Sequence, residues 1–488
     1  MLKIFCALVI ALGLAGNSFA QDLNFNAESY EVKEINNIAF RAYENICYVS
    51  RPSEPEYQVM SIYIPVEYFQ DGGTVNNYSA ETAPIFMPNG VGGYMPGKIA
   101  APGFGRDGKA NASLAALKRG YVVAAPAIRG RTLTHGKAPA LIVDYKAAVR
   151  YLRYIKRLNL LPAGDTDKII SNGTSAGGAL SALLGATGNA AEYKKYLDEI
   201  GAADERDDIF ASMAYCPITD LDHADMAYEW IFNGINEYHQ AKMLRPMNGG
   251  GNNRPENAPL DTRAAALMSD VQIAASNKLK AMYPDYLNSL NLKDAQGNLL
   301  TLDANGEGSF KEFIKNIYIA AAQSALDADK SALNNIKCFG VEGDKVVSMD
   351  LKAYAEWATR LKAAPAFDAL DNSSGENNEF GTESIEAQHF TAFAYANSLV
   401  KAGMADEAII KLLNPLNFIG RDGVSTAKHW RIRHGVLDRD TVLAVPAVLA
   451  LKLLNNNCAV DFKSPWGYGH AGDYDLNELF DWIDSICR

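Results

Sequence analysis

The sequence has few of the residues that build metal centres or disulfide frameworks. Six cysteines and seven histidines occur in 488 residues. No two cysteines stand at a metal-binding spacing and no His-Glu-x-x-His motif occurs, which argues against a zinc enzyme. Five of the cysteines are scattered over more than 400 residues, which is not the pattern of a disulfide framework. A single disulfide between Cys458 and Cys487 is still compatible with the sequence. We therefore expect metal-free chemistry without a cofactor.

Positively charged residues are outnumbered by negatively charged ones. The chain has 46 Lys plus Arg against 57 Asp plus Glu, a formal net charge of −11. A nucleic-acid-binding protein needs a basic surface, so this composition argues against nucleic acid as a partner. The hydrophobic fraction of 48% is ordinary for a globular protein. Because a single hydrophobic core rarely exceeds ~250–300 residues, we expect two domains or one domain with a large insertion.

The first twenty residues form a separate segment. Lys3 is followed by an apolar run from Ile4 to about Gly16 and then by Ser18-Phe19-Ala20. This is the layout of a secretory signal peptide with a small-residue cleavage site. The apolar run is shorter than the ~20 residues that span a bilayer. We therefore predict that residues 1–20 are a signal peptide and that the mature protein is secreted or periplasmic, with no membrane attachment after cleavage.

Short apolar runs alternate with amphipathic segments from residue 56 to about 215. The segment 141–158 has apolar residues at helical spacing, and the strand-like runs fall at 57–66, 84–88, 121–128, 168–171 and 210–216. Strands that alternate with helices of this length indicate a parallel sheet in an α/β fold.

The pattern changes near residue 217. Residues 220–415 are mostly helical in pattern, and the α/β alternation returns after them. We predict a core made of residues 21–219 and 416–488, interrupted by a large, mainly helical lid at 220–415. Within the lid, Asp303-Ala-Asn-Gly-Glu307 resembles the start of a calcium-binding EF-hand loop. Ile314 stands where that loop needs a bidentate Glu, so we predict an ordinary turn.

A Gly-x-Ser-x-Gly motif joins a strand to a helix of small residues. It reads Gly173-Thr-Ser175-Ala-Gly177 and follows the strand-like run at 168–171. In α/β hydrolases such a turn exposes a nucleophilic serine at the start of a helix, where the dipole favours developing negative charge. We predict Ser175 as the nucleophile; the alternative is a packing turn without chemistry.

The same fold places an acid and then a histidine downstream of the serine. His470 lies in a glycine-rich loop before the last predicted helix and is the best candidate for the base. Asp438 and Asp440 share one loop, and either carboxylate is suited to orient the imidazole. One of them is alternatively a cap for the helix that is expected to begin near Thr441. The remaining histidines lie in the lid, before the serine or before the acid loop.

These motifs carry a family resemblance. The strings GTSAGGALSALLGATGN, IRHGVLDRDT, APIFMPNGVGGYMPG and WGYGHAGDYDL resemble bacterial tannases (tannin acyl hydrolases) of the Lactobacillus type, members of the α/β-hydrolase superfamily, and the similarity covers nearly the whole mature chain. Fungal-type tannases and feruloyl esterases have Cys before the catalytic Ser and His, whereas Thr174 and Gly469 stand there in this chain. The resemblance implies the triad Ser175, Asp438 and His470.

The resemblance also implies a galloyl-binding set. Lys362, Glu376 and Asp440 match the family residues that hydrogen-bond the three phenolic hydroxyls of gallate. For the oxyanion, the serine-hydrolase template predicts the backbone N–H of Ala176 and one N–H from the loop 89–93, for which Gly90, Gly92 and Gly93 are candidates.

The function predicted from the sequence is that of a secreted serine esterase. It would hydrolyse galloyl esters such as tannins and alkyl gallates to gallic acid through a galloyl-enzyme, with a small-molecule ester as its partner. Another carboxylesterase, for example one of feruloyl type, would keep the triad without the galloyl site. A catalytically inactive secreted binding protein on the same scaffold is the third possibility.

Overall fold

The computed structural model describes residues 23–105, 107–239 and 265–488. The predicted signal segment 1–20 lies outside these ranges. Within them, no helix combines the length and the apolar character that a membrane crossing requires.

A nine-stranded sheet runs through the molecule, in the order β1-β2-β3-β7-β6-β8-β9-β14-β15. The first four strands in this order pair antiparallel, and the rest of the sheet is parallel. The strands are β1 Glu31–Ile35, β2 Ile38–Cys47, β3 Val59–Pro65, β6 Pro84–Pro88, β7 Val122–Pro126, β8 Asp165–Thr174, β9 Ala211–Tyr215, β14 His429–Arg433 and β15 Ala459–Lys463. The parallel part matches the alternation in the sequence, whereas β1 and β2 were not predicted.

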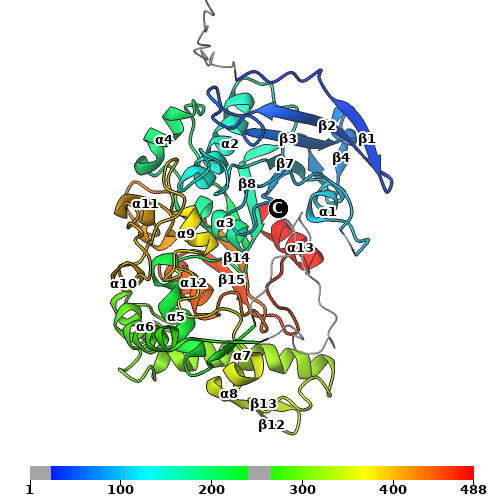
Figure 1. Cartoon of the computed structure of the whole chain (residues 1–488). Coiled ribbons are helices and arrows are strands. Elements are labelled where there is room, and N and C mark those ends of the chain that lie inside the picture. Colours follow the sequence, from blue (N-terminus) through cyan, green and yellow to red (C-terminus); the bar gives the residue numbers. More distant parts are fainter. Residues whose placement is uncertain (1–22, 106, 240–264) are drawn as a thin grey trace, which may run out of the picture.

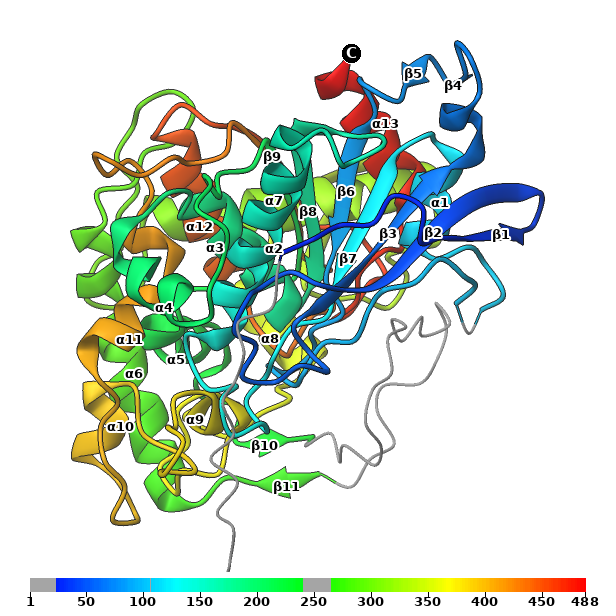
Figure 2. The same ribbon diagram turned by 90° about the horizontal axis from the view of Figure 1, so that it is seen from above.

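Helices cover both faces of the sheet. One face carries α2 and α3, which pack together, and α1 packs against α13 on the other (Figure 2). Strands β6, β7 and β9 are buried at every residue, as expected for parallel strands between two helical layers. The core helices are α1 Ala112–Lys118, α2 Ala140–Arg157, α3 Ala176–Ala186, α4 Lys194–Glu199, α12 Ala444–Leu454 and α13 Leu476–Cys487.

The chain between β9 and β14 is mainly helical in its described part. Figure 1 shows α7, α8 and the β12–β13 hairpin at the opposite end of the molecule from β1 and β2. The helices are α5 Leu221–Phe232, α6 Asp270–Ser289, α7 Ser309–Ala328, α8 Leu351–Ala358, α9 Gly375–Glu379, α10 Ala392–Ala396 and α11 Glu407–Leu412. Two short antiparallel strand pairs accompany them. They are β10 Glu237–Tyr238 with β11 Ala266–Leu267, and β12 Phe339–Glu342 with β13 Lys345–Met349. A further short pair, β4 Thr74–Val75 with β5 Tyr78–Ser79, precedes β6 in the chain.

The structure also tests the cysteine pairing and the turn at Asp303. The five cysteines in the described ranges are all free, so Cys458 and Cys487 are not bridged. The calcium-like string is a turn in which the Asp303 carboxylate accepts from the N–H groups of Asn305 and Glu307.

Candidate active site

Ser175 occupies a sharp turn between β8 and α3. Its φ of 63° lies in the left-handed region, which a side-chain-bearing residue adopts only when its surroundings enforce it. The backbone N–H of Ser175 donates to the carbonyl of Tyr215, 3.0 Å away, at the end of the neighbouring strand β9. The turn therefore presents the serine at the carboxyl edge of the parallel sheet, at the N-terminus of a buried helix.

The glycines of the motif are required by the loop that follows β6. A Cβ at Gly173 would lie 2.4 Å from the Asn89 amide nitrogen, and one at Gly177 would lie 2.5 Å from the Asn89 amide oxygen. Asn89 uses this proximity, since its Nδ2 donates to the Gly177 carbonyl at 3.0 Å and its Oδ1 accepts from the Val91 N–H at 3.2 Å. Asn89 thus ties the serine turn to the predicted oxyanion loop.

In that loop, the N–H of Val91 donates to Asn89, so the glycine N–H groups are the loop candidates for an oxyanion donor. Met95 N donates to Gly92 O at 3.0 Å and closes a tight turn in which Gly93 has a φ of 55°. A Cβ on Gly90 would lie 2.6 Å from the Lys98 carbonyl, so the close packing of this loop requires glycine there.

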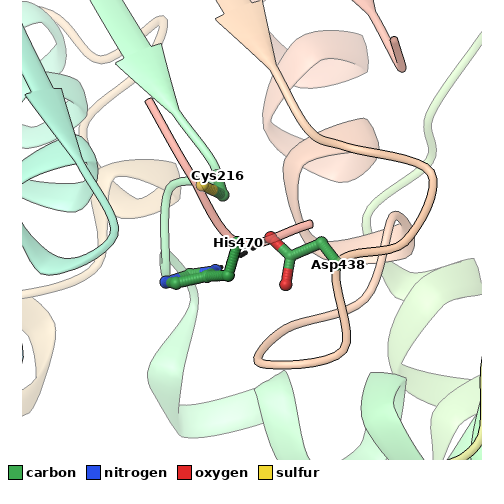
Figure 3. A group of neighbouring side chains, drawn as sticks. All are labelled: Cys216, Asp438 and His470. Carbon is green, nitrogen blue, oxygen red and sulfur yellow. Dashed lines mark hydrogen bonds and ion pairs between the residues drawn. The ribbon is translucent and has the colours of Figure 1, made fainter. Parts of the chain in front are cut away.

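The predicted acid and base are in contact. His470 Nδ1 lies 2.8 Å from Asp438 Oδ2, and each residue comes from the loop that follows a parallel strand, β14 for Asp438 and β15 for His470 (Figure 3). Asp438 Oδ1 accepts from the N–H groups of Asp440 and Thr441. Helix α12 begins at Ala444 without a side-chain cap, so neither aspartate caps it.

The charges of this pair shift each other's pKa. Burial raises the pKa of Asp438, but the imidazoles of His470 and His434 outweigh it and hold that pKa at about 2. Burial lowers the pKa of His470, but the Asp438 carboxylate outweighs it and raises that pKa well above 6.5. An ionised Asp438 therefore fixes a proton on Nδ1 of His470, which leaves Nε2 as the basic nitrogen once the ring is neutral.

In the described part of the chain, His470 Nε2 is buried and has no hydrogen-bond partner. Catalytic hydrogen bonds are often long or unformed when no substrate is bound, so this nitrogen is available to accept the serine proton. Cys216, which sequence reasoning did not single out, directly follows β9 and lies beside the ring (Figure 3). Its thiol donates to the Ala471 carbonyl at 3.1 Å, next to the base.

The residues predicted to bind the galloyl ring meet next to this pair. Lys362 Nζ lies 2.9 Å from Asp440 Oδ1, and the two side chains are 23% and 29% exposed. Burial lowers the pKa of Lys362, but Asp440 and Glu376 outweigh it and raise it. Burial raises the pKa of Glu376, and Lys362 opposes that rise. Asp440 also donates its backbone N–H to Asp438, so the partly exposed Lys362–Asp440 ion pair lies next to the catalytic pair.

Buried residues that sequence reasoning missed hold Lys362 in place. Arg360 Nε donates to the Lys362 carbonyl at 2.7 Å, and its Nη2 pairs with the fully buried Glu229 of α5 at 2.6 Å. The Tyr228 hydroxyl accepts from the Lys362 N–H at 3.3 Å and donates to the Arg439 carbonyl at 2.9 Å. Tyr228 thus connects the lid segment that carries Lys362 to the core loop that carries Asp440.

A second polar cluster has the composition of a metal site. Asp220, Asp222 and His223 bring their ligating atoms within 4.8 Å of one another. Asn414 donates to both carboxylates at 2.7 and 2.8 Å, and the ring of Tyr286 stacks on His223 at 3.7 Å. The cluster is satisfied by these neighbours and connects α5 to α6 and to the chain after α11.

A cavity of about 760 Å³ lies between α4 and α11. It is lined by Lys195, Tyr196, Lys411 and Phe418 among others, and by none of the residues of the Asp438–His470 site.

The parallel sheet with a serine at the strand-to-helix turn places the chain among the α/β hydrolases. The family model described as BD-FAE matches residues 92–253, whereas no curated protein matches. The Fusobacterium nucleatum tannase structure is 50% identical with a TM-score of 0.89, covering 96% of this chain and 100% of that one. The native tannin acyl hydrolase of Lactobacillus plantarum is 43% identical with a TM-score of 0.86, covering 96% and 99%.

The same tannin acyl hydrolase in complex with ethyl gallate is also similar, with 43% identity and a TM-score of 0.86 over 96% of this chain and 99% of that one. The chain belongs to the tannase (tannin acyl hydrolase) family and is a carboxylic ester hydrolase. The predicted fold and family are thereby confirmed.

Proposed function

We propose that this enzyme is a secreted serine esterase that hydrolyses galloyl esters to gallic acid. The observation that carries the proposal is the Lys362–Asp440 ion pair, in which Asp440 donates its backbone N–H to Asp438, the partner of His470. The similar tannin acyl hydrolase in complex with ethyl gallate supports the same class of substrate.

In the proposed mechanism, Ser175 Oγ attacks the ester carbonyl while His470 Nε2 takes its proton. The tetrahedral oxyanion accepts hydrogen bonds from the N–H of Ala176 and from Gly92 or Gly93, and Asp438 stabilises the imidazolium. His470 then protonates the departing alcohol, which leaves a galloyl ester on the serine. Water, deprotonated by the same imidazole, releases gallic acid and restores the serine.

Selectivity follows from the charges around the ring. The Lys362 ammonium donates to one phenolic oxygen, and the carboxylates of Asp440 and Glu376 accept from the others. An ester without these hydroxyls cannot form these hydrogen bonds, each of which contributes about 1.5–3 kcal/mol when one partner is charged. The enzyme should therefore prefer a trihydroxylated ring to a bare one.

The direct test compares hydrolysis of methyl gallate, methyl ferulate and methyl benzoate by the mature enzyme. We expect strong preference for the gallate, complete loss in Ser175→Ala, and full activity in Ser331→Ala, which removes an exposed serine remote from the site. Equal rates on the three esters would contradict the galloyl assignment and favour a general carboxylesterase. Failure of a serine-directed phosphonate to label Ser175 would instead favour an inactive binding protein.

Export has its own test. If residues 1–20 are a signal peptide, the protein recovered from the periplasm or the medium should begin at Gln21, which N-terminal sequencing determines.

A further inference from the structure

Arg131 lies between two parts of the proposed site that are far apart in the sequence. It follows β7, and its guanidinium is directed at both the predicted oxyanion loop and helix α9, which carries Glu376. No step of the proposed mechanism uses this side chain.

On the core side, Arg131 holds two consecutive carbonyls of the loop. Its Nε donates to the Gly93 carbonyl at 2.8 Å, and its backbone N–H donates to the Tyr94 carbonyl at 2.8 Å. Both loop residues have left-handed backbones, with φ of 55° and 57°, which is unusual for the buried Tyr94. The orientation of these peptide groups therefore depends on Arg131.

On the lid side, the same guanidinium fixes α9. Its Nη1 donates to the side-chain oxygen of Asn378 at 3.0 Å. The guanidinium also packs on Gly375, where an added Cβ would lie 3.3 Å from the guanidinium carbon. Glu376 stands between these two contacts, and the Arg131 charge lowers its pKa against the larger effect of burial, which raises it.

We propose that Arg131 is a positioning residue that sets the separation between the oxyanion loop and the ring-binding helix α9. A rigid galloyl ester is held at its ring by Glu376 and must present its carbonyl to the loop N–H groups. Because the ring and the carbonyl are conjugated and nearly coplanar, the two ends of the site must keep one fixed distance. Errors of about 1 Å in such placement cost up to ~10²-fold in rate.

This inference rests on the proposed galloyl function. Arg131→Lys is the informative variant, because it keeps the charge beside Glu376 but removes the planar fork that reaches both partners at once. We expect kcat for methyl gallate to fall about tenfold with little change in KM. For 4-nitrophenyl acetate, whose acyl group does not reach α9, kcat should fall less than threefold.

A double-mutant cycle distinguishes positioning from general support of the fold. In a Glu376→Ala background the ring has no anchor on α9, so Arg131→Lys should cost less than about twofold on methyl gallate. Lys137→Met is the matched control, since Lys137 Nζ donates to the carbonyls of Asn378 and Glu386 at 3.0 Å each, and among the described residues its hydrogen bonds go to the lid and not to the oxyanion loop. It should leave the kcat ratio of the two esters unchanged.

The outcomes separate this inference from the function on which it rests. Equal losses on both esters, a change confined to KM, or additive effects in the cycle would overturn the role of Arg131 while methyl gallate remains a substrate. A wild-type enzyme that hydrolyses 4-nitrophenyl acetate but not methyl gallate would overturn the galloyl function and this inference together.

Discussion

Lys362→Met separates recognition of the galloyl ring from the ester chemistry. Methionine keeps an unbranched stem beside the Phe367 ring, whose centroid lies 4.2 Å from Nζ, and removes only the ammonium group. A hydrogen bond to a charged group contributes about 1.5–3 kcal/mol, which corresponds to about 10–150-fold in kcat/KM. We expect a loss of that size for methyl gallate and less than about threefold for methyl benzoate, which has no hydroxyl to bind.

The substitution also has an electrostatic consequence. The variant removes the ammonium group that lies 2.9 Å from the Asp440 carboxylate. The negative charge of Asp440 already raises the pKa of His470. The pKa of His470 should therefore rise further, so the acid limb of kcat/KM should move to higher pH, and the two esters must be compared above that limb. Lys411→Met, which removes an exposed lysine paired with Glu407, is the control. Equal losses for gallate and benzoate would refute the recognition role.

Three further predictions concern the catalytic pair, the lid and the thiols. Asp438→Asn removes the charge that raises the pKa of His470, so a pH–rate profile should show the acid limb at lower pH and kcat reduced about 10³–10⁴-fold. Arg360→Met leaves the buried Glu229 unpaired and should cost ~3–5 kcal/mol of unfolding free energy in urea titrations. A thiol reagent should label the partly exposed Cys47 first, and the buried cysteines only on unfolding.

The parallel half of the sheet was predictable because its strands contain short apolar runs, such as 121–128 between two glycines, that alternate with helical segments. Strands β1 and β2 escaped prediction because they are largely half-exposed and join the sheet through antiparallel pairing at its edge. The start of α12 was misplaced by three residues, because Asp438 uses its carboxylate on the preceding loop instead of capping the helix.

The site residues also fall into those that the sequence pattern predicted and those that it did not. The nucleophile turn was predictable because strand, glycines and helix are contiguous in the sequence. Lys362 and Glu376 were found only through family resemblance, because Lys362 meets Asp440 across 78 residues of chain and no local pattern encodes that contact. Arg131 and Tyr228 carry no local signal either. Cys216 had one, since it directly follows a strand of the parallel sheet, where functional side chains gather.

The lid leaves the sheet after β9 and returns at β14, and these two strands are hydrogen-bonded neighbours. Because β9 and β14 run parallel, this segment starts at the carboxyl edge of the sheet, where the loops of Asp438 and His470 also begin, and must cross to the amino edge before β14 begins. Lys362 and Glu376 lie in this crossover, whereas Ser175, Asp438 and His470 lie outside it. Substitutions in the crossover can therefore change the acyl preference while the residues of the ester chemistry stay the same.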